Sequence, residues 1–170
     1  LKGEIDGYSE YSGTISQEIL GDPALVAELE IRSALASRGI SMSRPLGFNN
    51  TYVIGMKQDL ADSLNIRRIS DLTRHPDLSL GFSIEFMDRE DGWPSLRNRY
   101  ALPHEDVFGL EHSLAYQGLE SGTIQATDLY STDAEIDYYS LRVLEDDLGH
   151  FPDYNAVILY RPEIRSEYPA

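Results

Sequence analysis

Hydrophobic and polar positions along the chain predict strands and helices that follow one another in turn. Helical spacing of apolar residues predicts helices over residues 15–20, 22–39, 60–64, 94–100 and 110–122. Short apolar or alternating stretches predict strands over residues 4–11, 52–56, 78–82, 123–130, 142–144 and 155–160. Such an order is typical of an α/β fold with a mainly parallel sheet.

Polar residues, prolines and glycines next to these segments predict where several helices begin and end. The N-cap candidates are Asp22 before Pro23, Asp59, Ser70 and the run 131–133. Pro94 is placed to open a helix, and the expected C-terminal glycines are Gly39 and Gly122.

Composition excludes several classes of function. The chain of 170 residues carries 29 acidic and 14 basic side chains, for a formal net charge of -15. Nucleic acids and anionic membrane surfaces both require a basic face, so neither is an expected partner. The absence of cysteine excludes disulfides and thiol catalysis. No apolar run approaches the roughly 18–20 residues that a membrane-spanning helix needs.

Five short polar motifs fall at predicted strand ends or strand-to-helix turns. They read S-E-Y-S-G-T, G-F-N-N-T-Y, D-R-E-D-G, D-L-Y-S-T-D and F-P-D-Y-N, and they contain Tyr11, Tyr52, Arg89, Tyr130 and Tyr154. Open α/β sheets bind ligands at strand ends. Because aromatic faces attract a cation and a guanidinium binds a carboxylate, the motifs predict a pocket for a small zwitterion with a quaternary ammonium group.

Two further residues belong to this hypothesis. Thr14, after Gly13, can offer its hydroxyl and a backbone N–H to an anion near a helix start. Asn50 lies two positions before Tyr52, so both side chains share one face of an extended segment.

Each motif also has an ordinary structural explanation. Tyr11 and Tyr154 fit half-buried strand and turn tyrosines, and Asn50 fits a turn. Arg89 lies among acids and fits a solvated ion pair, while Tyr130 precedes a candidate helix cap. The binding hypothesis therefore depends on the five motifs acting together.

Enzymatic function has weaker support. The sequence contains no G-x-S-x-G, H-E-x-x-H, phosphate-binding loop or G-x-G-x-x-G motif, and its four histidines are scattered. The many acids leave a carboxylate-based hydrolase as an alternative. The acidic residues around Arg89 lack the spacing of a calcium loop, so we expect no catalytic residue, metal or cofactor.

In order and approximate spacing, the motifs resemble the substrate-binding proteins of osmoprotectant-type ABC importers, which take up glycine betaine, choline, carnitine and related compounds. The similarity runs across nearly the whole chain. It rests on Glu4–Thr14, Pro45–Tyr52, Gly81–Gly92, Tyr130–Asp133, Leu144–Asp147 and Phe151–Tyr154.

The resemblance implies a two-lobed fold of the type II periplasmic-binding-protein class that closes on its ligand like a hinge. The second lobe looks complete and the first partial. The implied divisions are residues 1–51 for partial lobe 1 and hinge, 52–153 for lobe 2, and 154–170 for the hinge and the return strand. We therefore expect the chain to be part of a longer protein.

The resemblance also implies roles for individual residues. Tyr11, Tyr52, Tyr130 and Tyr154 would form an aromatic box, and Arg89, helped by Thr14, would hold a carboxylate. The implied partners are a small betaine-type ligand and a membrane permease. The implied location is extracytoplasmic, with the protein either lipid-anchored or fused to its permease.

Two alternatives stay open at this stage. Some family members carry aspartate where this chain has Asn50, which suggests a different ligand, such as the larger betaine ergothioneine. The same fold also serves in ligand-sensing or permease-fused receptor domains.

Overall fold

The computed structural model describes residues 5–167, which form two compact units. Unit 2 is the continuous segment Tyr52–Phe151. Unit 1 combines the described residues before Tyr52 with those from Pro152 onward. Among residues 5–167, no helix has both the length and the apolar character that crossing a bilayer requires.

Unit 2 is built on a five-stranded sheet in the order β5-β4-β6-β3-β7. Its strands are β3 (Tyr52–Lys57), β4 (Leu80–Ser83), β5 (Val107–Leu110), β6 (Ala126–Tyr130) and β7 (Leu141–Val143). β4 runs parallel to β5 and β6, whereas β3 is antiparallel to β6 and β7. The prediction of a mainly parallel sheet was therefore wrong, because apolar periodicity reveals a strand but not its direction.

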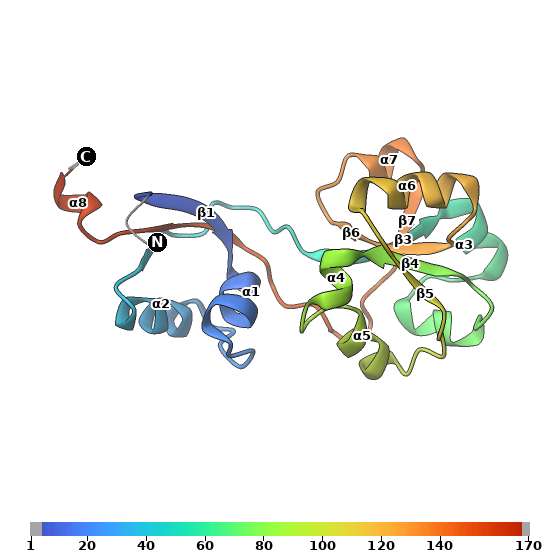
Figure 1. Cartoon of the computed structure of the whole chain (residues 1–170), viewed down its shortest axis with the longest axis horizontal. Helices are drawn as coiled ribbons and strands as arrows, with labels where there is room; N and C mark the ends of the chain where they lie inside the picture. Colours follow the sequence, from blue (N-terminus) through green and yellow to red (C-terminus); the bar gives the residue numbers. More distant parts are fainter. Residues whose placement is uncertain (1–4, 168–170) are drawn as a thin grey trace. The chain divides into compact units, whose positions relative to one another are not determined.

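Helices cover both faces of this sheet. They are α3 (Gln58–Leu64), the 3₁₀ segment η2 (Ile69–Arg74), α4 (Ile84–Asp88), α5 (Trp93–Tyr100), α6 (His112–Ser121) and α7 (Glu135–Tyr138). Figure 1 shows α6 and α7 on one face and α5 on the other. Because β4 and β6 are covered on both sides, all four residues of β4 and the first four of β6 are buried.

Unit 1 contains a smaller, fully antiparallel sheet in the order β1-β8-β2. Its elements are β1 (Gly7–Tyr11), α1 (Ser12–Thr14), the π-helix η1 (Ile15–Leu20), α2 (Glu28–Ser37), β2 (Ser41–Met42), β8 (Ala156–Tyr160) and α8 (Ile164–Glu167). In Figure 1, α1 and α2 lie on the same side of this sheet. The core contains Ile15, Ile31, Leu35, Met42, Val157 and Leu159. Glu4, which we expected in the first strand, lies outside the described residues.

Several predicted helix starts were wrong because their polar side chains form other hydrogen bonds. α2 begins at Glu28, while Asp22 accepts the N–H of Ala24 in a separate turn (3.1 Å). Ser70 lies inside η2 and donates its hydroxyl to Asp147 (2.7 Å). Asp133 does not cap α7 but accepts the N–H of Tyr130 (2.8 Å).

Other boundaries show which local signals were dependable. No side chain caps α3, although Asp59 lies in its first turn. The predicted helix over 110–122 begins at His112, because Val107–Leu110 forms the unpredicted strand β5. α5 starts at Trp93 with Pro94 in its first turn, and α6 ends at Ser121 with Gly122 as its C-cap, so these two signals are confirmed to within one residue.

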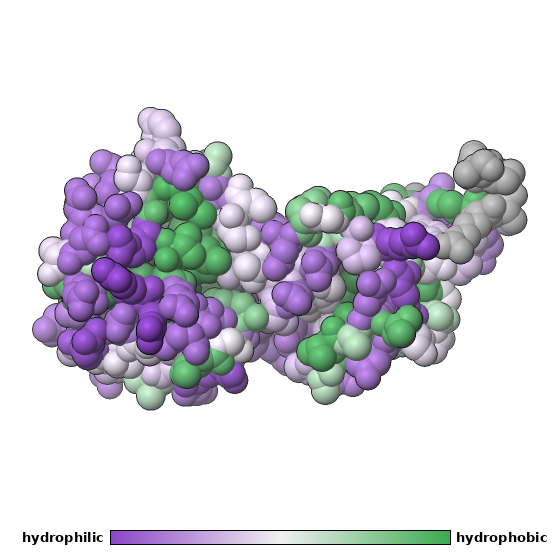
Figure 2. Space-filling view, turned by 180° about the vertical axis from the view of Figure 1, so that it is seen from behind, coloured by the Kyte–Doolittle hydropathy of each residue, from purple (hydrophilic) through white to green (hydrophobic). Residues whose placement is uncertain are grey.

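The exposed surface mixes apolar and hydrophilic groups. Figure 2 shows an apolar patch on unit 2 that is bordered by hydrophilic residues. Large apolar side chains exposed on this unit include Ile84, Phe108, Leu114, Tyr138, Val143 and Leu148.

A buried carboxylate joins β6 to the start of α4. Asp128 accepts the backbone N–H of Ser83 (2.6 Å) and its hydroxyl (2.7 Å). The same hydroxyl oxygen accepts the N–H of Phe86 (3.1 Å), which makes Ser83 the N-cap of α4. Burial raises the pKa of Asp128, while the two hydrogen bonds from Ser83 act in the opposite direction.

We predict that Ser83→Ala lowers the free energy of unfolding of unit 2 by about 1–3 kcal/mol, because it removes a helix cap and a donor to a buried carboxylate. Urea denaturation followed by the fluorescence of Trp93, which is buried in this unit, measures the change. As a control, Ser63→Ala removes a helix serine on the surface and should change stability by less than about 0.5 kcal/mol. Equal effects of the two substitutions would contradict the role of Ser83.

Two histidines give unit 2 a predicted pH dependence. Burial lowers the pKa of His104 and His150 below the ordinary value of 6.5. The unfolded chain then takes up protons at a higher pH than the folded chain. Stability is therefore full above about pH 6.5 and falls as the pH drops toward the folded-state pKa values.

We predict that His104→Gln makes this fall smaller, because glutamine does not titrate yet can still donate to the carbonyl oxygen of His75, which lies 3.0 Å from His104 Nε2. Urea denaturation at about pH 7.5 and about pH 5.5, chosen to bracket the ordinary histidine pKa, compares the variant with the wild type. An unchanged difference between the two pH values would show that His104 does not contribute.

Candidate ligand-binding site

Aromatic rings gather on unit 2 where β6 ends and β3 begins. Tyr52 and Tyr130 are paired across these two strands, and their ring centroids lie 5.1 Å apart. Phe86, from α4, lies 5.3 Å from the Tyr52 ring, and Phe151 lies 6.3 Å from it. The structure thus brings two of the four predicted tyrosines together and adds two phenylalanines.

Glu85 joins the two tyrosines through their hydroxyl groups. Tyr52 Oη donates to Glu85 Oε1 (3.0 Å), and Tyr130 Oη donates to Glu85 Oε2 (3.3 Å). Burial is the main cause that raises the pKa of both phenols above its ordinary value of 10.0. Both tyrosines therefore stay neutral near pH 7 and can donate to the carboxylate.

Arg89 lies beside the same rings and is held by an acidic partner. Its Nε and Nη2 atoms donate to the two carboxylate oxygens of Asp91, at 2.7 and 3.0 Å. The side chains of Arg89 and Asp91 are only 10% and 4% exposed. The guanidinium carbon lies 5.3 Å from the centre of the Tyr52 ring, within the range of a cation–π contact.

The loop that carries Arg89 and Asp91 depends on a close backbone approach. A Cβ atom on Gly92 would lie 1.9 Å from the carbonyl oxygen of Phe86, so only glycine permits this path. His150 Nε2 lies 2.9 Å from the carbonyl oxygen of Asp91, which fixes the loop from another segment.

A second group of polar and aromatic side chains supports Tyr130. The His112 ring lies 4.9 Å from the Tyr130 ring. Asp133 Oδ2 accepts the N–H of Tyr130 (2.8 Å) and the hydroxyl of Tyr116 (2.6 Å), and it lies 3.3 Å from His112 Nε2. An open hollow of about 250 Å³ borders this group. These contacts fix the position of Tyr130 from the side of α6.

Unit 1 contains the other predicted site residues. Tyr154 is buried, and its ring lies against Gly13, where a Cβ atom would be 2.6 Å from Tyr154 Cε1. The Tyr154 backbone donates to Asn49 Oδ1 (2.9 Å) and accepts the N–H of Asn50 (3.0 Å).

These contacts bring the F-P-D-Y-N and G-F-N-N-T-Y motifs together. Ser12, between Tyr11 and Gly13, donates its hydroxyl to the carbonyl oxygen of Asp153 (2.8 Å), which brings in the first motif as well. Tyr11, Thr14 and Asn50 are each half-buried in this unit.

Four residues of the unit 2 cluster had no predicted role: Glu85, Phe86, His112 and Phe151. Glu85 and Phe86 stand inside one of the segments that carried the family resemblance. The spacing of four residues between Glu85 and Arg89 could have drawn attention to Glu85, because residues four apart on a helix are neighbours.

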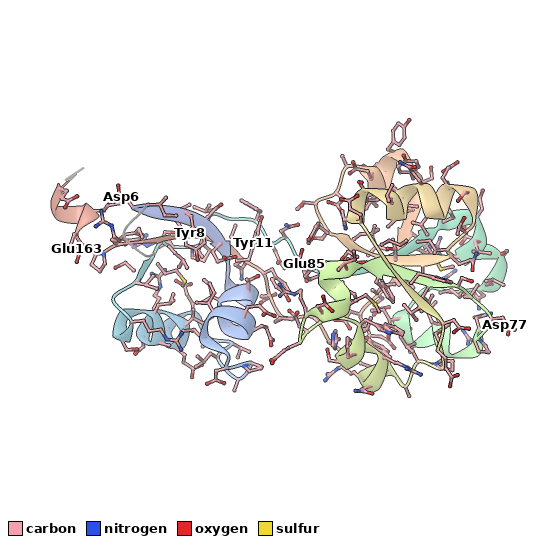
Figure 3. The ribbon with its side chains drawn as sticks, in the orientation of Figure 1. Asp6, Tyr8, Tyr11, Asp77, Glu85 and Glu163 are labelled. Atoms are coloured by element: carbon pink, nitrogen blue, oxygen red, sulfur yellow. The ribbon has the colours of Figure 1, made fainter. Side chains whose placement is uncertain are left out.

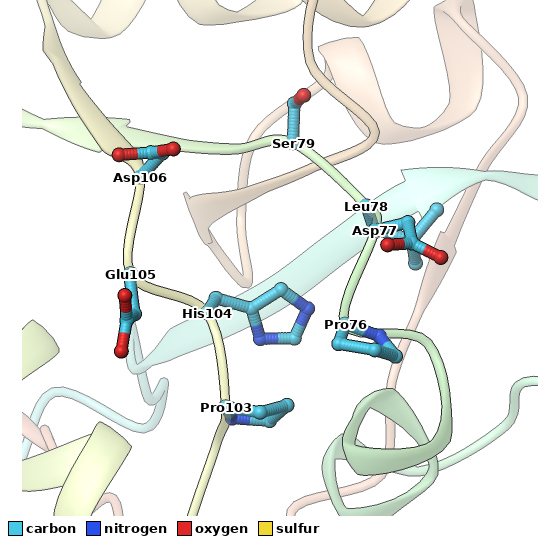
Figure 4. Close-up of a pocket in the computed structure, with 8 residues that line it drawn as sticks. All are labelled: Pro76, Asp77, Leu78, Ser79, Pro103, His104, Glu105 and Asp106. Carbon is cyan, nitrogen blue, oxygen red and sulfur yellow. The ribbon is translucent and has the colours of Figure 1, made fainter.

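A different hollow lies at the other end of the unit 2 sheet. It has a volume of about 370 Å³ and is lined by residues 76–79 before β4 and 103–106 before β5. Figure 4 shows His104 between these two segments, with Asp77, Glu105 and Asp106 around it. Within the described part of the chain, no group of three or more histidine, cysteine or acidic side chains is arranged to hold a metal ion.

Comparison with known proteins places the whole chain in one family. Residues 1–170 match the family described as the substrate binding domain of ABC-type glycine betaine transport systems. The chain is 33% identical over 178 residues to the ergothioneine transport permease/ergothioneine binding protein EgtU of Helicobacter pylori (strain G27), covering 99% of this chain and 31% of that protein. It is 30% identical over 178 residues to the carnitine transport binding protein OpuCC of Listeria monocytogenes, covering 99% and 58%. The chain thus spans less than two thirds of the length of each relative.

Solved structures agree with this match. A glycine betaine/carnitine/choline ABC transporter crystal structure has a TM-score of 0.79 and 26% identity, over 99% of this chain and 64% of that chain. Lactococcal OpuAC, in its closed form with glycine betaine, has a TM-score of 0.64 and 14% identity over 99% and 62%, which supports the fold alone.

These comparisons confirm two expectations from the sequence. The fold is the α/β fold of type II periplasmic binding proteins. The family consists of solute-binding components of ABC transporters and not of enzymes. The chain belongs to the family of substrate binding domains of ABC-type glycine betaine transport systems.

Proposed function

We propose that this chain captures a quaternary ammonium compound for an ABC importer. The ligand class comprises glycine betaine, choline, carnitine and related betaines. The observation that carries the proposal is the cluster of Tyr52, Tyr130, Phe86 and Phe151 around Glu85 and Arg89, in a chain of this family. The protein works outside the cytoplasm with a membrane permease, either lipid-anchored or fused to that permease.

The proposed mechanism is binding without chemical change. Each contact between a desolvated ammonium and an aromatic ring contributes up to about 2 kcal/mol. Several such contacts, together with one contact to a ligand carboxylate, support an affinity near micromolar, which corresponds to about -8 kcal/mol after the ordering costs. The Tyr52 and Tyr130 rings are already held by the strand pairing and by the hydrogen bonds to Glu85, which reduces those ordering costs.

The remaining predicted residues are part of the same proposal. Tyr11 and Tyr154 complete the aromatic box, Arg89 and Thr14 hold a ligand carboxylate, and Asn50 faces the ligand. The contribution of Arg89 to ligand binding is mainly electrostatic, because its Nε and Nη2 atoms already donate to Asp91.

A second candidate ligand is a larger betaine. The Helicobacter pylori relative is named as both an ergothioneine transport permease and an ergothioneine binding protein, and it shares 33% identity with this chain. The same match favours a receptor domain fused to its permease as the alternative arrangement.

Titration calorimetry of the intact protein with glycine betaine, choline, carnitine and ergothioneine tests the function. We expect at least one of them to bind near the micromolar range, in line with the contact energies above. Absence of heat for all four compounds, confirmed by an equilibrium assay with a radiolabelled ligand, would contradict the proposal.

We predict that Tyr130→Ala weakens binding of the best ligand by about 1–3 kcal/mol, because it removes one aromatic face of the box. The matched control is Tyr138→Ala, which removes an exposed tyrosine of the same unit and should leave affinity unchanged. Equal affinities for the two variants would remove Tyr130 from the site.

We predict that Arg89→Lys weakens binding of glycine betaine at least about tenfold more than binding of choline, because lysine cannot form the two-point contact with Asp91 that holds the positive charge in place, and choline has no carboxylate to attract. Calorimetry with both ligands gives the ratio of the two dissociation constants. The control is Arg97→Lys on α5, which should leave the ratio unchanged. A purely structural role for Arg89 would instead weaken both ligands by the same factor.

A further inference from the structure

Glu85 places a carboxylate within the aromatic cluster. It lies in the first turn of α4, and its two oxygens accept the hydroxyls of Tyr52 (3.0 Å) and Tyr130 (3.3 Å). Figure 3 shows it on α4, at the opposite end of unit 2 from Asp77. Its side chain is 58% exposed, so a ligand at the rings can approach it.

The charges around the rings do not cancel. Arg89 and Asp91 form a nearly buried pair in which two guanidinium nitrogens bind both carboxylate oxygens. Glu85 Oε1 lies 3.6 Å from Arg89 Nη1, which is an ion-pair distance but longer than a strong hydrogen bond. This set holds one guanidinium and two carboxylate side chains, so its formal charge is negative.

The hydrogen bonds to Glu85 favour a particular kind of cation. Each carboxylate oxygen of Glu85 already accepts a phenol hydroxyl. A quaternary ammonium has no N–H to donate, so it needs aromatic faces and an opposite charge but no further acceptors. The Tyr52 and Tyr130 rings, 5.1 Å apart and tilted by 42°, supply those faces beside the same carboxylate.

We propose that Glu85 determines specificity, as the counter-charge for the quaternary ammonium of the ligand, and that it makes the site prefer choline, a net cation, over the zwitterion glycine betaine. The inference rests on the proposed function, because it assumes a quaternary ammonium ligand. A carboxylate on the ligand is repelled by Glu85 and attracted by Arg89, whereas the cationic head is attracted by Glu85 whether or not the ligand carries a carboxylate.

The test compares Glu85→Gln with the wild type in calorimetric titrations of the intact protein with choline chloride and with glycine betaine. We expect the variant to bind choline about fivefold more weakly, a loss at the upper end for a partly screened charge pair, and to bind glycine betaine within about twofold of the wild type. The wild-type preference for choline then disappears. Raising the salt concentration should weaken choline binding in the wild type and have less effect in the variant.

Two further variants separate charge from structure. Glu85→Asp keeps the charge and should keep the preference for choline. Glu105→Gln makes the same substitution at an exposed position before β5, at the other end of the sheet, and should leave both affinities unchanged.

The outcomes distinguish the two proposals. If the wild type binds none of the quaternary ammonium compounds, the proposed function fails. If the wild type binds them but prefers glycine betaine, or if Glu85→Gln weakens both ligands by the same factor, the role of Glu85 is overturned and the proposed function stands.

Discussion

The hydrogen bonds between Asp128 and Ser83 are the interaction on which the unit 2 site depends. Burying a carboxyl group away from solvent costs free energy unless hydrogen-bond donors satisfy it. Ser83 supplies two such donors to Asp128, its backbone N–H and its hydroxyl. This requirement fixes the end of β4 against β6. α4 starts at that point, so the same two bonds set where Glu85, Phe86 and, one turn later, Arg89 stand relative to Tyr130.

The pairing of β3 with β6 provides the other half of the arrangement. Tyr52 faces Tyr130 in register, and Ile54 faces Asp128 two positions further along. Residues two apart on a strand lie on the same face, so a register shift of one residue would turn Tyr52 away from Tyr130. The backbone hydrogen bonds between β3 and β6 therefore set the positions of the two tyrosine rings, and the hydrogen bonds to Glu85 orient their hydroxyl groups.

The sequence predicted the buried strands and the motifs better than it predicted strand direction and helix caps. β4 and β8 are short, mostly apolar runs, β6 has an alternating pattern, and α5 and α6 have a proline or glycine at the expected end. Asp22 and Asp133 have the residue type of an N-cap, but tertiary and turn donors bind them instead. β5 was missed because Leu110 also fits the helical pattern of the residues that follow it.

Site prediction had a similar limit. Motifs pointed to Tyr52, Arg89 and Tyr130, which the fold gathers in unit 2. Glu85 looks like an ordinary exposed acid in the sequence, and His112 like an ordinary helix residue. Their importance depends on partners more than fifteen positions away, such as Tyr130 for Glu85 and Asp133 for His112. Spacing along one segment carries no information about such pairs.

The discontinuity of unit 1 has a consequence for the order in which the chain acquires its structure. β1 pairs with β8 from nearly the opposite end of the chain, whereas every strand of the larger sheet comes from the single segment Tyr52–Phe151. During synthesis from the N-terminus, that segment can form its complete hydrogen-bond ladder before β8 has left the ribosome. β1 must wait for its partner, so its backbone hydrogen-bonding groups form an open strand edge that needs protection from aggregation while translation proceeds.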